Sequence, residues 1–114
     1  MQNGAAPFAL VVRFTVRPGA EPDFDSLVAR TTAAIREREP GTLVYACHRV
    51  DGEPRQRIFY ELYRDRAAFD LHERQDHVRH FLAAREELLE STVVDWLTLA
   101  DGKTPATTTA VHGG

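Results

Sequence analysis

Histidines are the first residues of this sequence that could do chemistry. The chain has five of them, and His72 and His77 flank the junction between two predicted helical segments. Imidazole changes its charge near neutral pH, so it serves as a base, a hydrogen-bond partner or a metal ligand. From their position alone, His72 and His77 either contribute to a pocket or cap helix ends through hydrogen bonds.

The remaining histidines give little sign of a metal site. His77 and His80 could share a helix face, but no cysteine lies near them and no pair of carboxylates has the spacing of metal ligands. We therefore expect no metal, a solvated His80 and no role for His112. The sequence also contains no Ser-His-Asp arrangement, glycine-rich phosphate loop or internal repeat.

Aromatic and polar side chains on predicted strands could line a small pocket. Tyr60, Tyr63 and Trp96 combine an apolar ring with a polar group, which suits the binding of a flat ligand, although most strand aromatics belong to a core. Arg13 is either a rim charge or an anchor for an anionic or enolic oxygen. His48 is either a satisfied core histidine or a substrate-binding residue. It cannot activate the neighbouring Cys47, because adjacent strand residues point to opposite faces.

Hydrophobic periodicity predicts the elements that would position these residues. Alternation with a period of two indicates strands, helical spacing indicates helices, and Asp-Gly and Pro-Gly steps indicate the breaks between them. The predicted elements are a strand at 8–16, a helix from about Pro22 to the Glu39-Pro40-Gly41 stop, strands at 43–50 and 56–63 around an Asp51-Gly52-Glu53-Pro54 turn, a short helix from the N-cap Asp65 to about His72, a second helix with Val78, Phe81, Leu82, Arg85, Leu88 and Leu89 on one face, and a strand at 91–99.

This order, β-α-β-β-α-β, predicts an α+β ferredoxin-like domain with a four-stranded antiparallel sheet and its helices on one face. The domain would span residues 8–100, between a flexible start at 1–7 and a disordered tail at 101–114. The other face of the sheet would have no cover. Residues 93–99 carry apolar side chains on both faces, so we predict that a second copy covers the bare face in a homodimer.

Composition excludes several classes of partner. The chain has 114 residues, 14 Lys and Arg against 17 Asp and Glu, and a net charge of −3, with no cluster of basic residues, so nucleic acid is not expected. The longest apolar run, 8–12, is far shorter than the ~20 residues of a membrane span. With no secretory signal and a single cysteine, we expect a cytoplasmic protein.

Several short motifs, in order and at consistent spacings over residues 8–99, resemble the antibiotic biosynthesis monooxygenase family. They are Pro18-Gly19-Ala20-Glu21, the segment 38–45 (REPGTLVY), the segment 60–69 (YELYRDRAAF), and His72-x4-His77-x3-Phe81. The resemblance implies a dimeric ferredoxin-like α+β barrel. It also implies oxidation of quinols, anthrones or related polyketide aromatics with O2 and without flavin, haem or metal.

The resemblance also assigns residues. His72 and His77 match the paired-histidine motif, which implies that they are catalytic, and Tyr60 and Glu61 match a Tyr-Glu step that binds substrate. The aromatic residue after that step is commonly Trp in the family and is Tyr63 here. The first strand has no Asn and no Trp precedes Trp96, which disfavours haem degradation. A non-oxidative isomerase or cyclase on the same barrel, and a non-catalytic binding protein, are the alternative functions.

Overall fold

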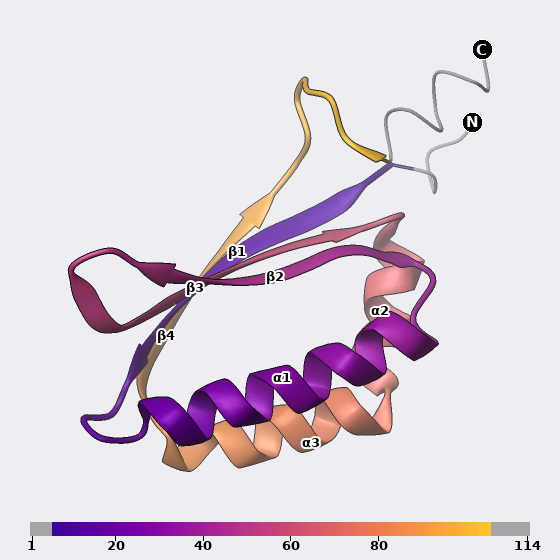
Figure 1. The fold of residues 1–114 in the computed structure, drawn as a ribbon. Coiled ribbons are helices and arrows are strands. Elements are labelled where there is room, and N and C mark those ends of the chain that lie inside the picture. Colours follow the sequence, from indigo (N-terminus) through magenta and orange to yellow (C-terminus); the bar gives the residue numbers. More distant parts are fainter. Residues whose placement is uncertain (1–5, 106–114) are drawn as a thin grey trace.

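A four-stranded antiparallel sheet with helices on one face forms the protein (Figure 1). The structure is a computed structural model that describes residues 6–105. Its elements are β1 (Phe8–Val16), α1 (Glu21–Arg38), β2 (Thr42–Val50), β3 (Glu53–Tyr63), α2 (Arg66–Arg74), α3 (Asp76–Ala84), the 3-10 helix η2 (Arg85–Glu87) and β4 (Leu89–Leu97). The strand order is β2-β3-β1-β4. The predicted ferredoxin-like α+β fold is confirmed; residues 1–5 and 106–114 of the predicted flexible ends lie outside the described residues.

Three predicted boundaries are wrong. Glu53 and Pro54 belong to β3, because the hairpin turns within Asp51 and Gly52, where a φ of 80° suits glycine. Leu89 was predicted on a helix but is the first residue of β4 and pairs with Val16. The last strand ends at Leu97, where its pairing with β1 ends.

Aromatic rings form the centre of the core between the sheet and the helices. Phe14 of β1, Phe59 of β3 and Phe24 of α1 are each at most 1% exposed. Phe14 meets Phe59 edge to face, with ring centroids 5.0 Å apart, and Phe81 of α3 closes the cluster. Edge-to-face contacts add about 0.5–1.5 kcal/mol to the burial of such rings.

The opposite face of the sheet has no cover among the described residues. The register places Val11, Tyr60, Ile58 and Val93 on this face, since their partners alternate with core residues. Val93 is 56% exposed and Leu97 is 37% exposed. In Figure 1 the helices all lie on the other side of the sheet. No helix among residues 6–105 is long and apolar enough to cross a membrane.

Phe59→Ala is expected to lower the free energy of unfolding by about 3–5 kcal/mol, because it removes a fully buried ring and leaves a cavity. Urea denaturation measures the change. Leu71→Ala is the control, since Leu71 on α2 is 51% exposed and its loss is expected to cost no more than about 0.5 kcal/mol. Equal losses in the two variants would contradict the central position of Phe59.

Candidate active site

A single residue forms the junction between α2 and α3. Gln75 has an extended backbone with φ −69° and ψ 140°, so it ends α2 and begins α3. Its N–H donates to the carbonyl of His72, and its own carbonyl accepts from the N–H of Val78 and of Arg79. The last turn of α2, with His72, and the first turn of α3, with His77, therefore approach the same place.

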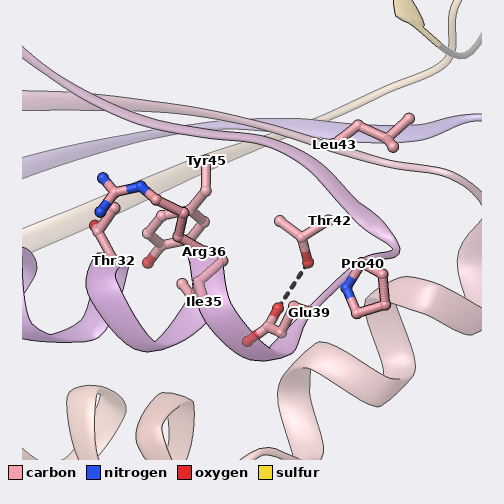
Figure 2. Close-up of a pocket in the computed structure, with 8 residues that line it drawn as sticks. All are labelled: Thr32, Ile35, Arg36, Glu39, Pro40, Thr42, Leu43 and Tyr45. Atoms are coloured by element: carbon pink, nitrogen blue, oxygen red, sulfur yellow. Dashed lines mark hydrogen bonds between the residues drawn. The ribbon is translucent and has the colours of Figure 1, made fainter.

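That place is occupied by Glu39, which follows the last residue of α1. His72 Nδ1 lies 2.6 Å from Glu39 Oε1, and His77 Nε2 lies 2.5 Å from Glu39 Oε2. The Thr42 hydroxyl donates to Oε1 as well, at 2.6 Å (Figure 2). All three side chains of the Glu39-His72-His77 cluster are at most 10% exposed. Neither histidine ring caps a helix end; both bind the carboxylate.

A glycine lets the helices come together around Glu39. A Cβ on Gly41 would lie 2.8 Å from the Cβ of Ala68 on α2, closer than two such atoms approach. The Gly41 carbonyl accepts from the N–H of Arg64, at 2.9 Å, which ties this loop to the end of β3. The Pro40-Gly41 step, predicted only as a helix stop, therefore also allows the close contact of α2 with the loop.

Glu39 was missed as a functional residue by the sequence prediction. Its position was the available signal, because a carboxylate at the C-terminal end of a helix faces the negative end of the helix dipole and needs compensation. Burial raises the pKa of Glu39, but hydrogen bonds from His72, Thr42 and His77 and the charge of His72 outweigh it, and the pKa lies below its usual value. The carboxylate is therefore the favoured form and accepts from both rings.

A cavity of about 300 Å³ lies between the sheet and the helices, next to His72. Its walls are mainly apolar, and its polar groups come from β2, β3, α2, η2 and β4. It is lined by Leu10, Val12, Phe14, Tyr45, Glu61, Phe69, His72, Glu73, Val78, Phe81, Leu82, Arg85, Thr92, Val94 and Trp96. Such a mixture is typical of a site for a small, flat ligand. We call it the central cavity.

A second cavity, of about 350 Å³, lies between α1 and the edge strand β2 (Figure 2). It borders Glu39 and Thr42, and Tyr45 lines both this cavity and the central one. Figure 2 shows the Tyr45 ring reaching from β2 toward α1. Tyr45 thus stands between the two cavities, and its hydroxyl has no hydrogen-bond partner among residues 6–105.

Glu61 presents a buried carboxyl group to the central cavity. The residue is 7% exposed, and the Tyr63 hydroxyl donates to its Oε1 at 2.5 Å. Oε2 has no protein partner in the described part of the chain. Burial raises the pKa of Glu61, although the hydrogen bond from Tyr63 and the charge of His72 oppose the change. The second oxygen is therefore free to bind a ligand.

Arg85 is a cation in the wall of the cavity that the sequence prediction placed only on an apolar helix face. Its guanidinium lies 5.1 Å from the Phe14 ring centroid and 5.6 Å from that of Phe81. Within residues 6–105 the guanidinium forms no hydrogen bond and no ion pair. Burial lowers the pKa of Arg85, because the charged form loses water. A half-buried cation that has only ring contacts, and no hydrogen bond or ion pair in this part of the chain, favours an anionic ligand.

The structure divides the predicted site residues between two faces of the sheet. His72, Glu61 and Trp96 line the central cavity, and Tyr63 binds Glu61. His77 does not line the central cavity and instead contacts Oε2 of Glu39. The remaining three, Tyr60, His48 and Arg13, lie on the uncovered face.

The structure also shows the surroundings of other residues named in the sequence analysis. Arg13 donates to the Gln56 side chain, and His48 is exposed beside the Ile58 carbonyl rather than buried in the core. Cys47 and His48 point to opposite faces, as predicted, and His80 is exposed, as predicted. His112 lies outside the described residues. Among those described, no group of three His, Cys, Asp or Glu side chains could hold a metal ion.

Glu61→Gln tests the raised pKa of Glu61. The folded protein holds this proton more tightly than the unfolded chain, so the stabilisation is present below the ordinary carboxyl pKa and is lost as the pH rises through the raised pKa. Glutamine does not titrate. The stability of Glu61→Gln relative to the wild type is therefore expected to increase from about pH 4 to about pH 8.

Urea denaturation at the two pH values measures this difference. Glu87→Gln is the matched control, because Glu87 is an exposed glutamate of η2 and its replacement should leave the pH dependence of the wild type unchanged. A Glu61→Gln variant with the pH dependence of the wild type would contradict the raised pKa.

Comparison with known proteins supports the same fold. The sequence profile of the antibiotic biosynthesis monooxygenase family matches residues 7–84. No curated protein matches the chain.

Solved structures are similar over nearly the whole domain. Rv0793 from Mycobacterium tuberculosis is 27% identical with a TM-score of 0.80, over 87% of this chain and 100% of that one. SO0527 from Shewanella oneidensis is 28% identical with a TM-score of 0.76, over 83% and 92%. SnoaB from Streptomyces nogalater, a cofactor-independent oxygenase, is 26% identical with a TM-score of 0.74, over 86% and 97%. With its family profile matched over most of its length, the chain belongs to the antibiotic biosynthesis monooxygenase family.

Proposed function

We propose that the protein is a cofactor-independent monooxygenase that oxidises a hydroxylated aromatic compound, such as a quinol, an anthrone or a related polyketide, with O2. The observation that carries the proposal is the central cavity, in which a buried histidine borders apolar and aromatic walls. Family membership and the similarity to SnoaB, itself a cofactor-independent oxygenase, support the same reaction type.

His72 is the proposed base. Its Nδ1 is engaged by Glu39, and its Nε2 has no partner in the described chain and retains accessible surface. In the neutral ring with a proton on Nδ1, Nε2 carries a lone pair. His72 Nε2 therefore takes a proton from the substrate, which is bound in the cavity that His72 lines.

The other polar groups of the cavity hold the substrate anion. Arg85 binds the developing negative oxygen, since its guanidinium has no anionic partner of its own in residues 6–105. Glu61 Oε2 binds a second hydroxyl group of the substrate. Trp96 and Phe69, whose ring centroids are 5.7 Å apart, form the aromatic wall at the β4 side.

Electron transfer to O2 then completes the proposed reaction. The substrate anion is electron-rich at carbon, and it passes one electron to O2, which yields a carbon radical and superoxide. These combine by forming a C–O bond, the peroxide takes up a proton, and the hydroperoxide loses water to leave a carbonyl group. The protein supplies the deprotonation, the binding of the anion and the exclusion of bulk water.

A second candidate, a non-oxidative isomerase or cyclase, is favoured by one observation. His72 and Glu61 line the same cavity from α2 and β3, and two separate titratable groups suit the removal of a proton at one carbon and its return at another. Product mass separates the two functions, since the monooxygenase product gains oxygen and the isomerised product keeps the mass of the substrate. Binding without turnover would instead indicate a non-catalytic binding protein.

The homodimer is part of the proposal. The uncovered sheet face carries Val93 and Leu97, 56% and 37% exposed, beside Val11 and Tyr60. A second copy that packs its own uncovered face against this one would bury these side chains, and it would form a closed barrel of two sheets. The substrate cavity lies on the helix side of the sheet, so each subunit would keep its own site.

His72→Ala is expected to lower kcat at least tenfold, or about 1.4 kcal/mol of barrier, because it removes the base. Oxygen uptake and product mass are measured with metal-free protein and candidate quinols and anthrones. His80→Ala is the control, since His80 is exposed on α3. No acceleration by the wild type over buffer, or activity only with added flavin or metal, would contradict the proposed function.

Val93→Asp is expected to shift the protein from dimer to monomer, because two charges would be buried in the proposed interface. Sedimentation analysis measures the mass in solution. Leu71→Asp is the matched control: Leu71 is also exposed and apolar, but it lies on α2, away from the uncovered face, so this variant should remain dimeric. A monomeric wild type would contradict the dimer.

A further inference from the structure

We infer that Glu39 is the positioning residue of this site: it holds His72 in the tautomer that leaves Nε2 unprotonated, and it stabilises the imidazolium that forms when Nε2 takes a proton. His77 holds Glu39 in place and does not meet the substrate. The proton transfer itself rests on the proposed function, whereas the tautomer of His72 does not.

The hydrogen bond between His72 and Glu39 determines the tautomer. An ionised carboxylate only accepts hydrogen bonds, so the ring nitrogen 2.6 Å from Oε1 must be the one that carries hydrogen. That nitrogen is Nδ1. Neutral His72 is then unprotonated at Nε2, and protonation there creates a cation directly against an anion. A carboxylate that orients a histidine base in this way is a recurring arrangement in enzymes that use such a base.

Glu39 is itself held from three elements. His77 of α3 donates to Oε2, while His72 of α2 and Thr42 of β2 donate to Oε1. The side chain of Glu39 is 4% exposed, so solvent screens these interactions little. His77 touches the carboxylate but lines no part of the central cavity. Its contact therefore acts on the base only through Glu39.

Stability alone does not account for the cluster. A buried ionic group is often replaced by packed apolar residues at no cost or with a gain in stability. Glu39 also lies at the C-terminal end of α1, where the helix dipole opposes a negative charge. Apolar residues at this point could join α1, α2 and α3 more simply. They could not, however, orient a ring nitrogen of His72.

Other charged and titratable groups surround His72, and they set the background for any pH dependence. Tyr45 of β2 and Tyr63 of β3 have ring centroids 5.6 Å and 5.1 Å from that of His72. Glu61 of β3 and Glu73 of α2 border the same cavity, and Arg64 shares a small pocket with Glu39 and His72. The test therefore compares variants of Glu39 and His77 in which these neighbours are unchanged.

The tautomer of His72 is measured without any substrate. Nitrogen-15 NMR of the imidazole rings distinguishes a proton on Nδ1 from a proton on Nε2. The wild type is expected to show Nδ1–H, and Glu39→Gln a mixture or the Nε2–H form, because the glutamine amide can donate to Nδ1. Thr42→Val and His77→Asn should keep Nδ1–H, since both keep the carboxylate. A His72 tautomer that is the same in Glu39→Gln and the wild type would overturn the inference.

Kinetics test the consequence for proton transfer. With a substrate that the wild type oxidises, Glu39→Gln is expected to lower kcat about 100-fold with KM changed less than about threefold. His77→Asn should lower kcat less than about tenfold. A His77→Asn variant that keeps Nδ1–H on His72 but loses as much kcat as Glu39→Gln would overturn the supporting role of His77.

Glu39→Asp is the control for misfolding in the same experiment. Glu39→Asp keeps the charge but shortens the side chain, so it should fold and keep part of the hydrogen bonding if Glu39→Gln does not fold. An intermediate kcat in this variant would support positioning, whereas a kcat equal to that of the wild type would contradict it. If the wild type oxidises no substrate but Glu39 sets the His72 tautomer, the proposed function fails and the positioning of the ring stands.

Discussion

The contact of one buried carboxylate with two histidines determines how the helices of this domain meet. Glu39 stands at the unfavourable end of α1, and His72 and His77 compensate it from α2 and α3. For both rings to reach one carboxylate, the chain must turn sharply between α2 and α3, which Gln75 does, and α2 must approach the loop after α1, which Gly41 permits. The wall of the central cavity that contains His72 follows from these requirements.

The two faces of the sheet have separate tasks in the proposed function. The helix side contains the aromatic core and the central cavity, which Trp96 helps to line. The other side carries the apolar residues of the uncovered face, including Val93 and Leu97. Because strand residues alternate, one run of sequence supplies both faces, and changes in the interface need not alter the site.

The charges around the cavity are arranged for an anion. Arg85 is a cation without an ion pair in residues 6–105, Glu61 has a raised pKa, and the Glu39 charge is compensated by the two rings. In the proposed reaction, an aromatic alcohol loses its proton to His72 and places its negative oxygen against Arg85. Family membership gives the fold. The chemistry of the proposed reaction depends on these side chains of the cavity.

The sequence by itself determined the order of the elements, the alternation of side chains along the strands and the position of the paired histidines. These are local properties: alternation predicted that Cys47 and His48 point apart, and Asp65 was recognisable as an N-cap, where it accepts from the N–H of Ala68 at 2.8 Å. Only the tertiary structure decided that Glu39 joins two histidines 33 and 38 residues away, and that Arg85 lines a cavity. The packing angle between helices sets such contacts, and periodicity carries no information about that angle.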